Sequence, residues 1–346
     1  MAEKILAAFR TPVAVSGREF MLTASIGIAV YPHDGGSVDE LMRSADTAMY
    51  HAKRDGGDSG EFFTRRMNQL VERQHALEEA MRGALERGEM AVHYQPVIDL
   101  AQGRIMGAEA LLRWRHPLLG NVGPHEFIPV AELSGQVKAL GEFVLREASA
   151  TARQWRERVG GSFHVSINVS PHQFRDPAFA DTVIAMLGAH GLPGEALEIE
   201  ITEGVLLSGI DNVHETLNVL QSAGVGIAMD DFGTGYASLS YLRDYPFSSL
   251  KIDRGFVMRM DQDPRSRELV VSAVRLAQSL GMKVIAEGIE TERQLRMLRE
   301  EGCRLGQGFL FSPAVDEEAF DALVRGEIEL SLAGDAAGGD GFRAVG

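Results

Sequence analysis

The chain has 346 residues, of which 45% are hydrophobic and 24% charged, and its formal net charge is −15. This length allows two domains, and the ordinary composition excludes collagen-like, disordered and disulfide-stapled proteins. The single cysteine, Cys303, cannot form an intramolecular disulfide, and one cysteine is too few for a zinc cluster.

The negative net charge also limits which ligands the chain can bind. No basic block is present that would neutralise a run of phosphates, so duplex nucleic acid is not expected as a ligand. A phosphorylated ligand would need local Lys or Arg, or metal ions, to reverse the sign of the field. No apolar run reaches the ~18–20 residues of a membrane span, so we expect a cytoplasmic fragment without membrane contact.

Residues 1–62 predict a small α+β piece. The run FMLTASIGIAV at 20–30 alternates, and VDELMRSADTAMYHAK at 38–53 has helical periodicity. So short a segment rarely forms a core of its own. At 63–88, apolar residues recur at helical spacing, with no glycine before Gly83, and we predict a linker helix. It is either a solvated amphipathic linker or a helix that transmits a signal or forms a dimer.

Residues 89–330 alternate short β-rich runs with longer helical stretches, a rhythm typical of a (β/α)₈ barrel, with a doubly wound sheet as the alternative. The tail at 331–346 is rich in Gly and Ala and is predicted to be disordered. The eight predicted strands are AVHYQPVI, RIMGAEALLRW, FHVSINVS, LEIEIT, GIAMDD, SLKID, MKVIAEG and CRLGQGF.

Polar side chains stand at the ends of seven of these runs, where a barrel places its functional residues. One such residue alone is more typical of a helix cap or a surface charge. Seven in succession predict a site. The residues are Glu109, Asn168, Glu200, Glu203, Asp230, Asp231, Lys251, Glu287, Glu290 and Gln307.

Carboxylates with an amide oxygen, and no cysteine or strand-end histidine, suit Mg²⁺ or Mn²⁺ better than Zn²⁺. Such a cluster repels itself, and divalent cations relieve the repulsion. Two metals about 3.5–4 Å apart can activate a water and hold a phosphodiester. Lys251 and Arg113 add positive charge for a phosphate, although Lys251 could instead serve a structural ion pair. Gly233 and Gly235 predict a flexible loop beside these residues.

These motifs together resemble the EAL-domain family of cyclic di-GMP phosphodiesterases, over about residues 85–325. Nine motifs occur in the family's order, which is far more specific than one EAL string. They are YQPVIDL from Tyr94, EALLRWRHP from Glu109, FIPVAE from Phe127, NVSPHQF from Asn168, EITE from Glu200, DDFGTGYASLSYL from Asp230, LKIDRGFV from Leu250, AEGIET from Ala286 and QGFLFS from Gln307.

The resemblance implies a barrel whose first strand is antiparallel, and hydrolysis of cyclic di-GMP to linear pGpG with two Mg²⁺ or Mn²⁺ ions. It implies that Lys251 is the catalytic lysine, that Glu287 is the general base and that Gln307 supports the water or the metals. The implied metal ligands are Glu109, Asn168, Glu200 and Asp230 for one ion, and Asp230, Asp231 and Glu287 for the other.

The resemblance also assigns supporting and substrate-contacting positions. Glu203 resembles the residue that anchors the loop starting at Asp231, and Glu290 a residue that contacts the metal ligands. One departure is Ser312 in FSPAV, where the family usually has a basic residue before Pro. Family members suggest a homodimer formed near the loop. The implied substrate contacts are Gln95, Leu111 and Arg113.

Residues 1–62 resemble the C-terminal third of a GGDEF diguanylate cyclase domain, through SIGIAVYPHDG from Ser25 and ADTAMYHAK from Ala45. The string GGDSGEF from Gly56 imitates the family's catalytic signature, but it follows the AMYHAK helix, whereas the signature loop precedes the SIGIA strand. We therefore expect no cyclase activity, and a fragment of a longer GGDEF–EAL protein whose preceding part could hold a membrane anchor.

Two other functions remain open at this point. A catalytically silent cyclic di-GMP receptor would keep the fold, although it has no need of the complete carboxylate set and Lys251. An unrelated metal-dependent barrel enzyme fits the strand-end residues alone, but not the ordered motifs.

Overall fold

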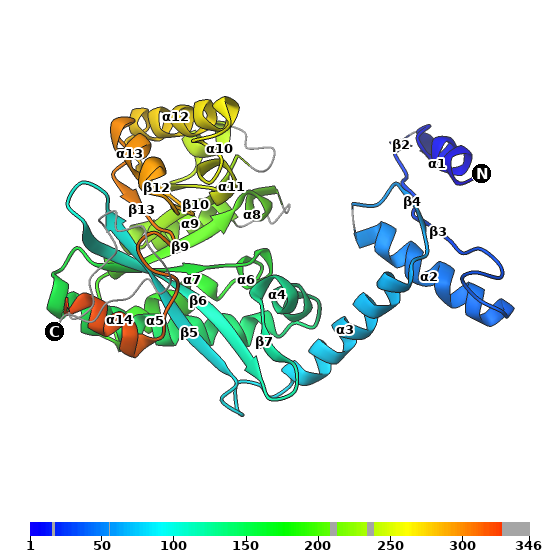
Figure 1. Ribbon diagram of the computed structural model, residues 1–346, viewed down its shortest axis with the longest axis horizontal. Coiled ribbons are helices and arrows are strands. Elements are labelled where there is room, and N and C mark those ends of the chain that lie inside the picture. The colour runs from blue at the N-terminus through cyan, green and yellow to red at the C-terminus, as the bar shows by residue number, and fades with distance from the viewer. Residues whose placement is uncertain (16–17, 55, 208–212, 234–238, 327–346) are drawn as a thin grey trace. The chain divides into compact units, whose positions relative to one another are not determined.

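The computed structural model describes residues 1–15, 18–54, 56–207, 213–233 and 239–326 (Figure 1). It divides into two compact units, Met1–Arg82 and Gly83–Gly346, and each is described by itself. The tail predicted at 331–346 lies outside the described residues. Within the described part of the chain, no helix is long and apolar enough to cross a bilayer.

The first unit is built around one helix packed on a pair of parallel strands. Gly27 allows this packing, because a Cβ at that position would lie 1.8 Å from the carbonyl oxygen of Ala45. Ala48, Phe63 and Met67 form a small buried cluster. The elements are α1 Ala2–Phe9, β1 Val13–Val15 antiparallel to β2 Arg18–Phe20, β3 Ile26–Ile28 parallel to β4 Gly60–Phe62, α2 Val38–Arg54 and α3 Arg65–Met81.

The helix predicted over 63–88 is shorter than expected, since α3 ends at Met81. Arg82 has an extended backbone, with a ψ of 116°, and Gly83 and Gly88 have φ values of +72° and +68°. The left-handed region favours glycine and ends a helix. A turn therefore separates α3 from the first strand of the second unit.

The second unit is a closed barrel of eight strands, which confirms the predicted fold and excludes the doubly wound sheet. The strand order is β5-β13-β12-β11-β10-β9-β8-β6, and β5 pairs with β6 to close the ring. β5 is antiparallel to both neighbours, as the resemblance implied, and the other adjacent pairs are parallel. The strands are β5 Met90–Asp99, β6 Arg104–His116, β8 His164–Asn168, β9 Leu197–Thr202, β10 Gly226–Phe232, β11 Ser249–Ile252, β12 Lys283–Ala286 and β13 Leu305–Gly306.

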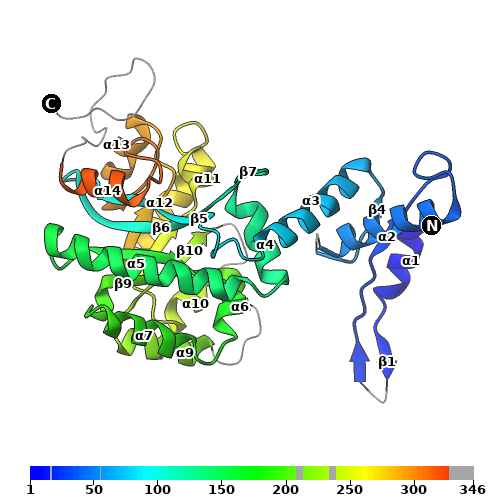
Figure 2. The same ribbon diagram turned by 90° about the horizontal axis from the view of Figure 1, so that it is seen from below.

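Helices cover the outside of the barrel, and the short strand β7 pairs antiparallel with the end of β6. The long helix α5 packs on β5, β6 and β8, and α14 packs on α5 and β5 (Figure 2). The covering elements are β7 Gly120–Val122, α4 Pro124–Leu133, α5 Val137–Val159, α6 Pro171–Phe174, α7 Phe179–Ala189, the 3₁₀ turn Gly194–Ala196, α8 Glu203–Leu207, α9 Val213–Ser222, α10 Leu239–Asp244, α11 Arg254–Val257, α12 Pro264–Ser279, α13 Glu292–Glu300 and α14 Glu317–Val324.

An aromatic cluster fixes the first barrel strand against its covering helices. The ring of Trp155 in α5 lies 4.8 Å from that of Tyr94 in β5 and 4.3 Å from that of Phe320 in α14. The Thr151 hydroxyl donates to the Tyr94 hydroxyl over 3.1 Å. Contacts of this kind hold β5 in register, and that register decides which side chains face the barrel axis.

Candidate active site

The strand pairing brings the predicted polar side chains together at one end of the barrel. Gln95 lies opposite Glu109 across the β5–β6 pair, and Asn168 lies opposite Glu200 across the β8–β9 pair. Asp230 follows on β10, beside the end of β9. Because the carboxyl ends of parallel strands meet at one end of a barrel, residues far apart in sequence become neighbours there.

Lys251 lies at the centre of this group. Its ammonium is 2.6 Å from a Glu200 oxygen and 2.7 Å from a Glu287 oxygen. It is also 3.2 Å from Glu109 and 3.4 Å from Asp230. Only 1% of the lysine side chain is exposed. One cation thus bridges four carboxylates that come from four different strands or strand ends.

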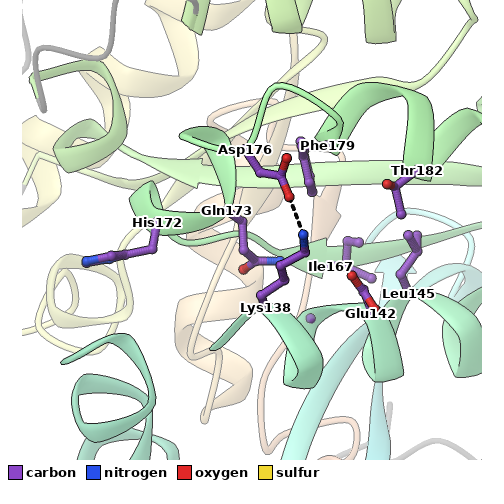
Figure 3. Close-up of a pocket in the computed structure, with 10 residues that line it drawn as sticks. Lys138, Glu142, Leu145, Ile167, His172, Gln173, Asp176, Phe179 and Thr182 are labelled. Carbon is purple, nitrogen blue, oxygen red and sulfur yellow. Dashed lines mark ion pairs between the residues drawn. The ribbon is translucent and has the colours of Figure 1, made fainter. Parts of the chain in front are cut away.

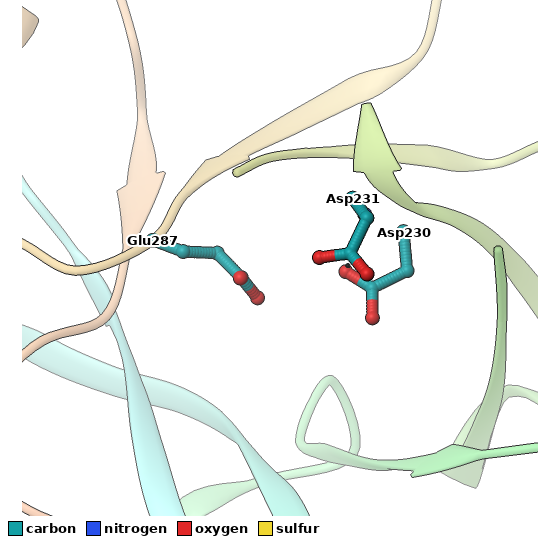
Figure 4. A group of neighbouring side chains, drawn as sticks. All are labelled: Asp230, Asp231 and Glu287. Carbon is teal, nitrogen blue, oxygen red and sulfur yellow. Dashed lines mark hydrogen bonds between the residues drawn. The ribbon is translucent and has the colours of Figure 1, made fainter. Parts of the chain in front are cut away.

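Asp230 and Asp231 reach the same site although they are adjacent in the chain. Asp231 has a φ of +53°, and its N–H donates to Asp230 Oδ1 over 2.9 Å. This left-handed residue breaks the alternation of β10, so both carboxylates lie on the side that faces Glu287 (Figure 4). One oxygen from each of the three residues lies within 4.8 Å of the others.

Burial and mutual repulsion shift the pKa values of these groups. Burial, together with the charge of Glu109, raises the pKa of Glu200 well above its ordinary value. Burial also raises the pKa of Glu287 to about 8, which Lys251 opposes. Burial opposes ionisation of Glu109, but Lys251 and two side-chain amides keep its pKa below the ordinary value. The cluster therefore carries more negative charge than its single lysine can stabilise.

The donor set fits hard divalent cations. Four carboxylates contact one ammonium, the carboxylate of Asp231 lies beside two of them, and the oxygens of this cluster belong to Glu, Asp, Asn or Gln side chains. Two buried oxygens, Glu200 Oε1 and Gln307 Oε1, have no hydrogen-bond partner in the described part of the chain. Unpartnered buried oxygens are costly, and oxygen ligands of this kind suit Mg²⁺ or Mn²⁺. The residues thus match the metal requirement that their types predicted.

Two amides link the carboxylates at the edge of the cluster. Asn168 Nδ2 donates to Glu109 Oε1 over 2.8 Å. The side-chain oxygen of Asn168 takes no part in this hydrogen bond. Gln307 Nε2 donates to Glu109 Oε2 over 2.6 Å and to Glu287 Oε1 over 3.1 Å. Gln307 is buried, so these bonds fix the position of Glu287 relative to Glu109.

Two cavities of about 640 and 530 Å³ flank the cluster, each large enough for part of a nucleotide. Glu109, Leu111 and Glu287 line both, and Gln95 lines the smaller one. Arg113 lines neither: its Nη1 donates to the Leu112 carbonyl over 3.1 Å, and burial lowers its pKa. Its contact with substrate remains a prediction.

Sequence reasoning missed two residues of this site. Asp253 and Arg254 line both cavities, and Asp253 Oδ1 accepts a hydrogen bond from the Gly255 N–H at the start of α11. Both residues directly follow the LKI strand. The rule that polar residues at strand ends belong to the site, which selected the other residues, would also have selected these two. The apolar wall that α4 contributes, which includes Pro124 and Ile128, has no local signature.

The predicted supporting residues lie farther from the cluster. Glu203 begins α8 and is buried, and burial raises its pKa; among the residues that the structure describes, neither carboxylate oxygen has a hydrogen-bond partner. Residues 234–238, which include most of the loop it was predicted to anchor, lie outside the described residues. Glu290 lines the smaller cavity and is exposed. Ser312 is buried, and its carbonyl accepts a hydrogen bond from Gln95.

A third hollow, between α5, α6 and α7, is too small for a nucleotide. Its volume is about 40 Å³, and an ion pair of 2.6 Å between Lys138 and Asp176 lies across it (Figure 3). Such a volume holds one or two waters. The two cavities at the carboxylate cluster therefore remain the candidate substrate site.

Comparison with known proteins agrees with this geometry. The EAL domain family model matches residues 78–314, and the model described as diguanylate cyclase, GGDEF domain, matches residues 1–59. Cyclic di-GMP phosphodiesterase NbdA of Pseudomonas aeruginosa is 37% identical over 325 residues, which cover 94% of this chain and 42% of NbdA. The bifunctional diguanylate cyclase/cyclic di-GMP phosphodiesterase MucR of the same species is 40% identical, over 94% of this chain and 47% of MucR.

The chain thus spans less than half the length of these two relatives. Among solved structures, the PaMucR phosphodiesterase in complex with c-di-GMP has 39% identity and a TM-score of 0.68, over 71% of this chain and 99% of that one. The cAMP-bound EAL enzyme Bd1971 has 36% identity and a TM-score of 0.70, over 75% of this chain and 72% of that one. The chain belongs to the EAL domain family, and its first 59 residues match part of a GGDEF domain.

Proposed function

We propose that this chain hydrolyses cyclic di-GMP to linear pGpG with two divalent cations, Mg²⁺ or Mn²⁺. The observation that carries the proposal is the buried cluster of carboxylates around Lys251, two of which, Glu109 and Glu287, line both of the large cavities. The names of two relatives and the ligand of one solved neighbour support cyclic di-GMP as the substrate.

The cluster offers ligands for two ions with a shared carboxylate. When bound, the ions would lower the pKa of a water and neutralise charge on the phosphodiester. Asp230 and Asp231 lie side by side across from Glu287, and one oxygen of each of the three lies within 4.8 Å of the others, an arrangement that suits Asp230 as the shared ligand (Figure 4). The proposed ligands are Glu109, Asn168, Glu200 and Asp230 for one ion, and Asp230, Asp231 and Glu287 for the other.

The remaining roles are those that the family resemblance implies, and contacts within the cluster support them. Glu287 accepts the proton of the attacking water, and its bonds to Lys251 and Gln307 hold it in place. The water oxygen joins phosphorus, and the bond between phosphorus and the ribose 3′ oxygen breaks. Lys251 stabilises the negative charge that develops on the phosphoryl oxygens. Solvent supplies the proton for the departing 3′ oxygen.

The test is incubation of the purified chain with cyclic di-GMP and Mg²⁺ or Mn²⁺, followed by chromatographic separation of the nucleotides. We expect pGpG to appear with metal and to be absent with a chelator. Unchanged cyclic di-GMP in the presence of metal, together with measurable binding of the nucleotide, would reject the hydrolase and establish the silent receptor.

The proposal extends to the domain organisation and the assembly. We assign residues 1–62 to a GGDEF-like remnant without cyclase activity, 63–88 to a linker and 89–330 to the phosphodiesterase barrel. The GGDSGEF string follows α2, which agrees with this assignment. Incubation with GTP should yield no cyclic di-GMP. We also propose a homodimer formed near the loop that starts at Asp231, and light scattering should give twice the chain mass of 37.7 kDa.

A further inference from the structure

A third large cavity, of about 500 Å³, opens at the other end of the barrel, where the parallel strands begin. Its lining comes from the starts of β6, β8, β12 and β13. The phosphodiester site uses the opposite ends of these strands, so this cavity has no part in the proposed hydrolysis. Its residues are Met106, Ser162, His164, Gln278, Met282, Lys283, Val284, Gly302, Arg304 and Leu305.

Two cations line this cavity with a single carboxylate partner between them. Arg304 Nε donates to Asp99 Oδ2 over 3.0 Å, and its terminal nitrogens have no partner among the described residues. For Lys283, no carboxylate of the described residues lies within ion-pair distance. In a chain of net charge −15, the Lys283 ammonium and the terminal nitrogens of Arg304, whose Nε is paired with Asp99, are thus available to an anion at this cavity.

The buried part of the cavity wall is polar, and two glycines leave space for the side chains of His164 and Glu198. His164 is nine-tenths buried, and its Nε2 lies 3.7 Å from Glu198 Oε2, an oxygen for which the described residues supply no hydrogen-bond partner. A Cβ at Gly107 would lie 2.8 Å from the His164 carbonyl oxygen and 3.0 Å from its ring. A Cβ at Gly226 would lie 3.1 Å from Glu198 Oε1. Two glycines therefore make space for the histidine and the glutamate.

Hydroxyl groups satisfy the other oxygen of that glutamate. Glu198 Oε1 accepts hydrogen bonds from Ser248, over 3.2 Å, and from Ser249. Glu198 does not line the cavity, and its nearer oxygen lies 3.7 Å from the His164 ring, beyond hydrogen-bond distance. Burial lowers the pKa of His164 and Glu198 opposes this, while the nearby charge of Lys283 lowers it further.

The rest of the lining is apolar. Met106, Met282, Val284 and Leu305 supply this surface, and the volume suits a small organic molecule. We propose that this cavity binds an organic anion, a carboxylate or phosphate monoester on an apolar body. The anionic group lies against Lys283 and Arg304, and the apolar body lies on the methionine and aliphatic side chains.

The test is titration calorimetry of the full chain with phenyl phosphate in the presence of a chelator, with benzoate as a second anion. We expect binding in the millimolar range or tighter. Benzyl alcohol, which keeps the ring without the charge, should bind at least about tenfold more weakly. Lys283→Ala should weaken phenyl phosphate binding about tenfold, the effect of losing one charge-assisted hydrogen bond. Met106→Trp should abolish binding by filling the cavity.

Arg113→Ala is the matched control, because it removes a cation near the carboxylate cluster and leaves this cavity intact. Its binding of phenyl phosphate should equal that of the unaltered chain. The proposal is wrong if the unaltered chain binds neither anion, or if Lys283→Ala binds as tightly as the unaltered chain. It is equally wrong if Arg113→Ala, and not Lys283→Ala, loses binding. None of these results depends on hydrolysis of cyclic di-GMP.

Discussion

Replacement of Lys251 by Met should destabilise the metal-free barrel strongly, and divalent cations should reverse the effect. The lysine is buried and contacts four carboxylates at 2.6–3.4 Å. Removing one partner of a buried ion pair costs about 3–5 kcal/mol, because the other charge remains buried and unpaired. In a domain of this size, about 1 kcal/mol shifts the melting temperature by ~2–4 °C. We therefore expect a loss of about 6–20 °C in the presence of a chelator.

Differential scanning calorimetry of the full chain checks this value. Metal at about 100 times its Kd should restore ~2.7 kcal/mol of the lost stability, since a cation then replaces the missing charge. Lys283→Met is the matched control: this lysine is exposed, and its replacement should change stability by no more than about 0.5 kcal/mol.

A double variant separates charge from packing. Glu200→Gln combined with Lys251→Met removes both partners of the 2.6 Å contact, so its loss of stability should be smaller than the sum of the two single losses. If the Lys251→Met chain has the same melting temperature as the unaltered chain in the presence of a chelator, the reasoning is refuted. Strictly additive losses in the double variant would also refute it.

Three further predictions concern other parts of the barrel. Glu287→Gln should lower turnover of cyclic di-GMP at least about 100-fold while its Kd changes less than threefold, as measured by product formation and calorimetry, because the amide keeps the shape and loses the base. Glu203→Ala should lower kcat, with metal affinity weakened; wild-type kinetics and metal affinity would exclude its anchoring role. Asp99→Asn should cost about 1–3 kcal/mol in urea unfolding at pH 7, because Asp99 accepts from two backbone N–H groups and Arg304. Burial opposes ionisation of Asp99, but these bonds hold its pKa below the ordinary 3.8. The stability that ionised Asp99 contributes to the fold is therefore complete above pH 3.8. It is lost as the pH falls through the lower pKa of the folded state. The two chains should thus converge in stability only below about pH 4, and a gap that closes at higher pH would contradict the assignment.

The eight barrel strands were predictable because each is a short apolar run, and seven of them have a polar residue at the end. Local pattern is enough for that, since buried strands need apolar side chains on both faces. The end of α3 at Met81 was mistaken because apolar periodicity continues past it, while the left-handed turn at Gly83 decides the boundary. Strand β7 is too short to give a pattern.

The members of the site were predictable, but their contacts were not. Sequence order gives Lys251 as one strand-end residue among several, and only the closed ring places it between carboxylates of four segments. The roles of Asp253 and Arg254 depend on the same closure. The cavity at Lys283 and Arg304 combines the starts of strands that are far apart in sequence, which no local pattern reveals.

The reversed direction of β5 decides at which end the polypeptide enters the barrel. Met90 pairs with Trp114, five residues past Glu109 on β6, while Asp99 pairs with Arg104 at the opposite end. The chain therefore arrives on the side of the carboxylates and about 17 Å beyond them, at ~3.3 Å per residue. A rotation or pull applied to the preceding segment would act first on β5 and β6, the two strands that carry Gln95 and Glu109. In an all-parallel barrel the same force would reach the far end, away from the catalytic residues.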